Sequence, residues 1–310
     1  MKTKNFKVSV IVPALNEAGN IGILVQQVIE VLSQFTDYEL IFVDDGSGDA
    51  TLELLRKQHI ENKRVKYISF SRNFGHQNAL RAGFDYASGD CVISMDGDLQ
   101  HPPKMIPQLI KKWKEGYDVV YTIRKEDPQL SPAKRITSRI FYWFMNKFTD
   151  LHIVNGAADF RLLDRCVIDI LRSIKENDLF LRGVISWIGF KRYGIEYMPD
   201  KRFWGATKYT VAKMVKFAFT GITSFSVKPL QLSTFVGGLL AFFSFLYGIY
   251  AIVAKLTTES TISGWTSVLT VILFIGGIQL VMIGILGEYI GRLFIESKKR
   301  PNYIIKEKGL

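Results

Sequence analysis

Two carboxylates stand two positions apart in the segment Asp96-Gly97-Asp98-Leu99-Gln100, directly after the apolar run 91–95. The glycine between them lets the backbone turn, so both side chains can reach one ligand. Hard carboxylate oxygens suit Mg²⁺ or Mn²⁺, and either ion in turn suits a diphosphate. A lone Asp-x-Asp pair is also common as a polar turn with solvated aspartates. Its value as evidence for a metal site therefore depends on the neighbouring motifs.

Other polar side chains follow earlier apolar runs. Asn16 and Glu17 follow the first run, and Asp44 and Asp45 end the second. These carboxylates could accept hydrogen bonds from a base or a ribose, although Asp-Asp-Gly-Ser is also an ordinary turn sequence. The chain contains neither a P-loop nor a Gly-x-Gly-x-x-Gly motif, so an ATPase or a dinucleotide enzyme has no support.

Histidine and cysteine show no metal-binding spacing. The four histidines form no His-x-x-His or His-Glu-x-x-His motif, and Cys91 and Cys166 lie far apart in the chain. Zinc chemistry is therefore not expected. Cys91 lies in an apolar strand pattern and is predicted to be a core residue.

Strands and helices alternate through the first part of the chain. Apolar runs predict strands at 7–12, 39–43, 65–70, 91–95 and 118–121. Helical spacing predicts helices at 16–35, 49–61, 76–87 and 102–116. This order predicts an α/β fold with a mostly parallel sheet and helices on both faces. Ligands bind beyond the carboxyl ends of such strands, where the acidic motifs fall.

Two later segments, 134–148 and 207–225, combine basic residues with aromatic-rich apolar faces. They favour interfacial amphipathic helices, with ordinary core-packing helices as the alternative. The formal net charge of +11 over 310 residues favours anionic lipid and phosphorylated substrates over nucleic acid as partners.

Two uncharged stretches, 232–254 and 264–287, are each long enough to cross a hydrocarbon core of about 30 Å. A buried hairpin of a soluble protein is the alternative, but such helices usually keep a polar edge. The second stretch is soon followed by Lys298, Lys299 and Arg300, whereas the segment between the stretches has one Lys and one Glu. With no signal peptide, this asymmetry predicts that both termini and the large N-terminal part are cytoplasmic.

The ordered motifs together resemble family 2 glycosyltransferases with a GT-A fold. Within that family the chain resembles the polyprenyl-phosphate glycosyltransferases, relatives of dolichol-phosphate mannose synthase, and most of all the bacterial bactoprenol glucosyltransferases. The resemblance covers nearly the whole chain. The segments that carry it are 12–17, 44–47, 71–75, 96–100, 158–162, 202–209, 221–226 and 286–301.

The resemblance implies a role for several residues. The uridine of a nucleotide sugar would be held by Pro13, Asn16, Glu17, Asp44 and Asp45. The divalent metal and the sugar diphosphate would be held by Asp96, Asp98 and Gln100. The basic positions near the phosphates would be Arg124, Arg202 and Lys208. Asp159 would orient the acceptor or shield developing charge, or else be a structural partner of Arg161.

The same resemblance implies transfer of a hexose from a UDP-sugar to undecaprenyl phosphate with inversion, glucose first and N-acetylglucosamine next. The second pKa of a phosphate monoester is roughly 6, so the acceptor is mostly dianionic at neutral pH and needs no strong general base. One alternative is a processive polysaccharide synthase, although the chain has no Gln-x-x-Arg-Trp motif. Another is a non-catalytic membrane scaffold that retains a dead transferase domain.

The predicted organisation has four parts. A nucleotide-sugar core spans 1–130, an acceptor-side region 131–228, a transmembrane hairpin 229–292 and a short cytoplasmic tail 293–310. Glycine pairs in both spans suit either packing within one hairpin or a homo-oligomer. A pathway that modifies the cell envelope would also require a flippase and a downstream glycosyltransferase.

Overall fold

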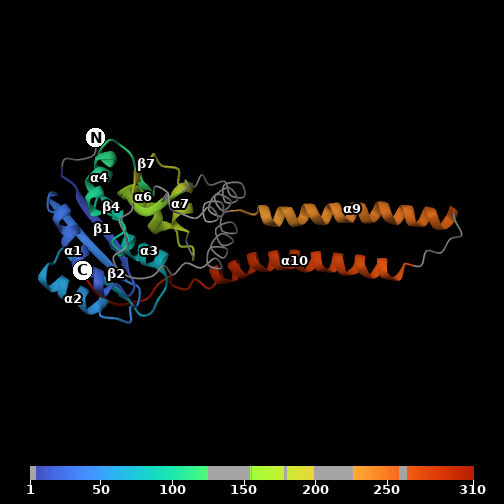
Figure 1. Ribbon diagram of the computed structural model, residues 1–310, viewed down its shortest axis with the longest axis horizontal. Coiled ribbons are helices and arrows are strands. Elements are labelled where there is room, and N and C mark those ends of the chain that lie inside the picture. The colour runs from blue at the N-terminus through green and yellow to red at the C-terminus, as the bar shows by residue number, and fades with distance from the viewer. Residues whose placement is uncertain (1–4, 125–153, 155, 178–179, 199–225, 258–263) are drawn as a thin grey trace. The chain divides into compact units, whose positions relative to one another are not determined.

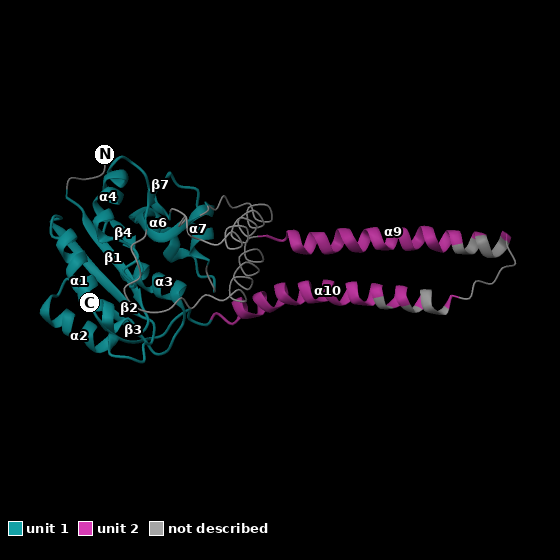
Figure 2. Ribbon diagram, in the orientation of Figure 1, with its two compact units in different colours: residues 1–146, 151–218, 300–310 teal, residues 147–150, 219–299 magenta. Residues whose placement is uncertain are grey.

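The computed structural model describes residues 5–124, 154, 156–177, 180–198, 226–257 and 264–310 (Figure 1). The chain divides into two compact units (Figure 2). The first comprises residues 1–146, 151–218 and 300–310, and the second comprises residues 147–150 and 219–299. The predicted amphipathic segments 134–148 and 207–225 lie outside the described residues, as do Arg202 and Lys208.

One eight-stranded sheet, in the order β7-β5-β6-β4-β1-β2-β3-β8, forms the first unit. The strands are β1 Lys7–Ala14, β2 Asp37–Asp44, β3 Val65–Phe70, β4 Cys91–Ser94, β5 Val119–Arg124, β6 Ala157–Asp164, β7 Arg192–Tyr197 and β8 Ile305–Gly309. The strands β4, β1, β2 and β3 run parallel, as do β5 and β7. The strand β6 is antiparallel to β4 and β5, and β8 is antiparallel to β3. The predicted α/β fold is confirmed, with antiparallel strands that the sequence did not indicate.

Helices cover both faces of this sheet (Figure 1). They are α1 Ala18–Leu32, α2 Thr51–Glu61, α3 His76–Tyr86, the 3₁₀ helix η1 Pro103–Met105, α4 Ile106–Lys114, α6 Arg165–Ser173 and α7 Leu181–Trp187. Val10 and Val12 of β1 belong to the same apolar core as Leu24 of α1 and Leu109 of α4. Ile11, between them, faces Gly83 of α3, where an added Cβ would overlap the isoleucine. Alternate side chains of β1 are thus buried on opposite faces of the sheet.

The second unit contains two long helices, α9 Lys228–Thr257 and α10 Trp265–Ser297. Their apolar segments Lys228–Tyr250 and Thr270–Ser297 have mean hydropathies of 1.8 and 2.3. The most apolar part of each segment contains no buried residue. Large apolar side chains such as Phe235 and Leu280 are 64% and 71% exposed. Unburied apolar helices of this length fit a lipid environment and argue against the hairpin of a soluble core.

The C-terminal segment differs from the predicted simple tail. Helix α10 continues to Ser297, and Ile305–Gly309 then forms the edge strand β8 of the first unit's sheet. Side chains along β8 alternate between partly buried and exposed, with Lys306 and Lys308 on the exposed side. Lysines on an edge strand oppose pairing with another chain. The segment is short and highly charged, so its sequence carries no strand pattern.

Candidate active site

Most of the predicted site residues that the structure describes lie at the carboxyl ends of the parallel strands. The register pairs Pro13 with Val43 and Ala14 with Asp44, and it pairs Ile11 with Ser94 just before the acidic pair. Asn16, Asp45 and Asp96 therefore leave the sheet at one edge. Strand β6 is antiparallel to both β4 and β5, so β4 and β5 run in the same direction. Arg124, the last residue of β5, therefore lies at the same edge. The predicted grouping of these residues is present in the fold.

Two histidines flank the Asp96 carboxylate. The Asp96 backbone N–H donates to Nδ1 of His101 at 2.9 Å. Since Nδ1 accepts, a neutral His101 carries its proton on Nε2, which lies 3.6 Å from Asp96 Oδ2. Nε2 of His76, the first residue of α3, lies 3.6 Å from Asp96 Oδ1. Sequence reasoning missed both histidines because it tested them only for zinc spacing.

The turn after Asp96 is fixed by its own hydrogen bonds. Asp98 is 9% exposed, and its Oδ1 accepts the backbone N–H of Gln100 at 3.1 Å. Leu99 adopts a φ of +62°, a left-handed conformation that non-glycine residues rarely take. A Cβ on Gly97 would lie 3.1 Å from the Pro13 carbonyl oxygen, so only glycine fits comfortably there. The backbone is thus shaped to present both carboxylates.

The acidic pair fits a divalent cation. Among the described residues, Asp96 Oδ1 is a buried oxygen with no hydrogen-bond partner. An unsatisfied buried carboxylate oxygen is costly, and a hard cation would satisfy it. Asp96 and Asp98 offer carboxylate oxygens and Gln100 an amide oxygen, the donor set that Mg²⁺ or Mn²⁺ prefers.

Asp159 is buried among arginines. Its Oδ1 accepts from Arg161 Nη2 at 2.6 Å and from Arg182 Nε at 2.9 Å, and its Oδ2 accepts from Arg182 Nη2 at 2.9 Å. Burial alone would raise the pKa of Asp159, but the guanidinium groups of Arg182 and Arg161 outweigh it and hold that pKa far below its usual range. The carboxylate is thus ionised, and both of its oxygens already accept hydrogen bonds from arginines. This supports the alternative in which Asp159 is a structural partner of Arg161. Arg182 was not singled out from the sequence, since it belongs to no motif.

The carboxylates of Asp44 and Asp45 are almost fully buried and support neighbouring loops. Asp44 accepts the Ser47 N–H at 3.0 Å and the Ser69 hydroxyl at 2.7 Å. Asp45 accepts the backbone N–H groups of Phe74 and Gly75, at 2.7 Å and 3.0 Å. Burial, the largest influence, raises the pKa of Asp45. Their predicted role in holding uridine stays a prediction, and their visible role is to order the loops 46–48 and 71–75.

Asn16 links the first strand end to the second. Its φ of +56° is left-handed, its N–H donates to the Ser47 hydroxyl at 2.9 Å, and its Oδ1 accepts the Gly48 N–H at 2.9 Å. The Glu17 N–H donates to the Thr51 hydroxyl at 2.9 Å, at the start of α2. Asn16 and Asp44 are therefore joined through Ser47, and Glu17 is bonded to the start of α2.

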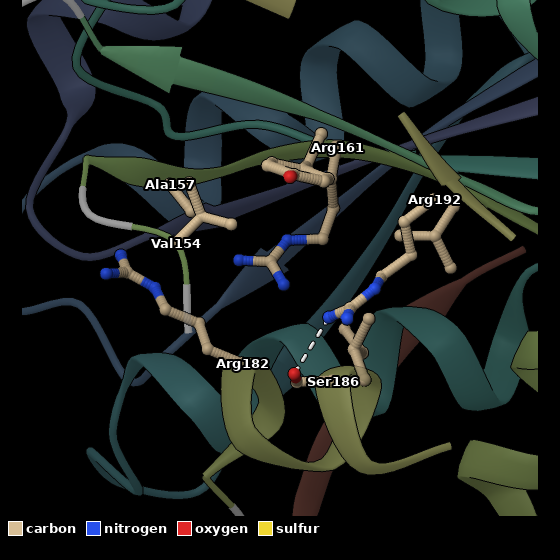
Figure 3. Close-up of a pocket in the computed structure, with 9 residues that line it drawn as sticks. Val154, Ala157, Arg161, Arg182, Ser186 and Arg192 are labelled. Carbon is tan, nitrogen blue, oxygen red and sulfur yellow. Dashed lines mark hydrogen bonds between the residues drawn. The ribbon is translucent and has the colours of Figure 1, made fainter. Parts of the chain in front are cut away.

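A cavity between β5, β6, β7 and α7 carries three arginines. Figure 3 shows Arg161, Arg182 and Arg192 projecting into it, with Val154 and Ala157 at one side. Arg192 donates to the Ser186 hydroxyl at 2.8 Å. Since Arg161 and Arg182 also hold Asp159, and since His76 Nε2 lies 3.9 Å from Asp159 Oδ2, this basic cavity adjoins the acidic edge.

The mixed sheet with an acidic pair at its carboxyl edge fits a GT-A glycosyltransferase, and the two apolar helices fit a membrane-associated protein. The chain belongs to the family "Glycosyl transferase family 2", whose model matches residues 9–169. A second model, "GtrB C-terminal hairpin", matches residues 228–293.

Relatives match along almost the whole chain. The "Uncharacterized glycosyltransferase YkcC" of Bacillus subtilis is 44% identical, over 98% of this chain and 95% of that protein. The "Bactoprenol glucosyl transferase" of Shigella phage SfV is 42% identical, over 97% of this chain and 98% of that protein.

The fold is also seen in a solved structure. The mannosyltransferase PcManGT from Pyrobaculum calidifontis, in complex with GDP-Man and Mn²⁺, has a TM-score of 0.51 at 17% identity. The alignment covers 72% of this chain and 64% of that one, and at this identity it supports the fold alone.

Proposed function

We propose that the protein transfers glucose from UDP-glucose to undecaprenyl phosphate at the cytoplasmic face of a bacterial membrane. The observation that carries the proposal is the 42% identity with a bactoprenol glucosyl transferase over 97% of this chain. The ordered acidic edge at Asp96 and Asp98 supports an active enzyme rather than a scaffold. UDP-N-acetylglucosamine is the second donor to test.

Asp96, Asp98 and Gln100 would hold Mg²⁺ or Mn²⁺. When bound there, the cation would neutralise charge on the leaving diphosphate. Asn16 and Glu17, with the loops ordered by Asp44 and Asp45, would receive the uridine. Pro13 is the second-last residue of β1, close to Asn16 in the chain.

The acceptor phosphate would be the nucleophile. One of its oxygens forms a bond to the anomeric carbon as the bond from that carbon to the diphosphate breaks, and UDP leaves. In-line attack inverts the configuration, so an α-linked donor gives a β-linked lipid phosphate sugar. Because the acceptor is mostly dianionic at neutral pH, the protein must chiefly bring two anions together.

Cationic side chains would supply that attraction. Arg124 ends β5 at the acidic edge, and the sequence adds Arg202 and Lys208. Arginine offers a planar fork to a phosphate, and lysine a point charge. Asp159 would act indirectly by fixing the guanidinium groups of Arg161 and Arg182.

The hairpin would hold this chemistry at the bilayer, with both termini in the cytoplasm. Its product would be a lipid-linked sugar on the cytoplasmic side. A flippase and a downstream glycosyltransferase would then be required to use it outside. Assembly as a homo-oligomer through the hairpin stays a prediction.

The test uses the purified protein in detergent with Mg²⁺, undecaprenyl phosphate and a panel of labelled nucleotide sugars. We expect label from UDP-glucose in the organic phase, and its loss in Asp98→Ala at an unchanged protein level. Label from a different donor would correct the sugar. No lipid-linked label from any donor, with Mg²⁺ or Mn²⁺, would reject the enzyme in favour of the scaffold.

A further inference from the structure

The C-terminal segment packs against a loop that forms part of the predicted donor site. Strand β8 pairs with β3, and the loop 71–75 follows β3 directly. The Ser71 backbone N–H donates to the Ile304 carbonyl at 2.9 Å, so the pairing extends to the start of this loop. At the other side of the strand, Arg56 of α2 forms two hydrogen bonds to the Glu307 carboxylate, at 2.7 Å and 2.6 Å.

Tyr303 makes the most specific contacts of this segment. Its ring stacks on Phe70, the last residue of β3, with ring centroids 5.1 Å apart and planes at 16°. Its hydroxyl donates to Asp85 Oδ2 of α3 at 2.7 Å. Burial and the Asp85 contact raise the pKa of Tyr303 well above its usual range, so the hydroxyl keeps its proton and the hydrogen bond at neutral pH. One side chain thus connects the tail to both β3 and α3.

The contacts continue from Phe70 to the acidic edge. Phe70 packs edge-to-face on Phe74, with centroids 5.7 Å apart. The backbone N–H of Phe74, and that of Gly75 beside it, donate to the buried Asp45 carboxylate. The next residue is His76, whose Nε2 lies 3.6 Å from Asp96 Oδ1. Tyr303 is therefore linked by two ring contacts to a loop that binds Asp45 and leads into His76 beside Asp96.

We propose that Tyr303 and strand β8 position the nucleotide-sugar site by holding the loop 71–75 in place. The tail would thus be a working part of the site for a nucleoside diphosphate sugar, although it lies more than 200 positions away in the chain. This proposal rests on the proposed function, because it takes Asp45 and Asp96 as part of the donor site.

The experiment compares full-length variants in detergent by calorimetric titration with UDP and Mn²⁺, and by steady-state kinetics for donor and acceptor. Tyr303→Ala removes the stack and the hydroxyl, and we expect its Kd for UDP and its KM for the donor to rise about tenfold. Tyr303→Phe keeps the ring, and we expect a rise of about two- to threefold. The acceptor KM should stay near that of the unchanged protein in both variants.

A matched control is Lys306→Ala, which alters an exposed side chain on the same strand. We expect no change in either KM. A lower melting temperature with unchanged Kd for UDP in the Tyr303 variants would overturn the proposal and leave β8 a purely structural strand. An equal rise in donor and acceptor KM would overturn it too. If the unchanged protein binds no UDP, the proposed function fails, and this inference fails with it.

Discussion

At the scale of single residues, His101 is the side chain most closely tied to Asp96. It is 5% exposed and stacks on Phe160, with ring centroids 5.1 Å apart, so its position is fixed by packing. From there Nδ1 accepts the Asp96 N–H, and Nε2 faces the carboxylate. His101 thus controls both the backbone and the side-chain direction of a predicted metal ligand.

We therefore expect His101→Leu to weaken Mn²⁺ binding about 10- to 100-fold, the usual effect of losing a group that orients a ligand. His101→Asn can place its amide oxygen near the position of Nδ1 and should retain affinity within a few-fold. A Mn²⁺ titration followed by electron paramagnetic resonance measures the affinity without turnover. Equal affinities in the unchanged protein and His101→Leu would remove this role.

Asp159 either acts on the acceptor or is a structural partner of Arg161, the two alternatives that the sequence left open. It is 8% exposed and pairs with Arg161, which is 5% exposed. Removing one partner of a buried pair leaves an uncompensated charge, which costs about 3–5 kcal/mol. We expect Asp159→Asn to lower the melting temperature strongly, whereas Asp169→Asn, at a carboxylate that is 57% exposed, should change it little. A stable Asp159→Asn protein with lost turnover would instead support the catalytic alternative.

At the scale of elements, Glu39 joins three strands near their amino ends, away from the acidic edge. This residue of β2 is 1% exposed and accepts hydrogen bonds from Ser9 of β1 at 2.6 Å and from Lys66 of β3 at 2.9 Å. Burial raises the pKa of Glu39, but the hydrogen bonds from Lys66, Ser9 and Ser88 outweigh it and lower that pKa from 4.5 to about 2.

A lowered pKa in the folded state contributes stability that is present above 4.5 and lost as the pH falls through about 2. Glu39→Gln should therefore lower the melting temperature at neutral pH and flatten its decline below pH 4.5. Thermal unfolding followed across this pH range measures both effects. Glu53→Gln, at an exposed position on α2, is the control, and an equally steep acid decline in Glu39→Gln would contradict the prediction.

Helices and strands were predictable where apolar residues recur at the regular spacing of a helix or a strand. Strands β1 to β5 and helices α1 to α4 were placed within a few residues, because their apolar residues are buried at regular intervals along each element. The strand β8 was not predicted, since its pairing depends on β3 and on contacts of Tyr303 with distant residues. Sequence spacing places Asp96 and Asp98 together, and His101 follows them closely in the chain. His76 comes from a separate helix, and only the fold brings it to Asp96.

At the scale of the whole molecule, the predicted orientation follows from the basic residues after the second span. The first unit, which carries the predicted active site and is called the catalytic unit below, has an exposed thiol that can report its side of the membrane. Cys166 is the second residue of α6 and is exposed, while Cys91 in β4 is fully buried. A membrane-impermeant maleimide should therefore react in the folded protein at one thiol, on the side of the membrane where the catalytic unit lies.

We expect this label in inverted membrane vesicles and not in right-side-out vesicles, because a cytoplasmic catalytic unit faces outward only in the former. Cys166→Ser should abolish the signal, which would establish that Cys91 stays protected by its strand. Labelling of right-side-out vesicles would place the catalytic unit outside the cell. The positive-inside argument would then fail, because Lys298, Lys299 and Arg300 would follow a span that ends on the outer face.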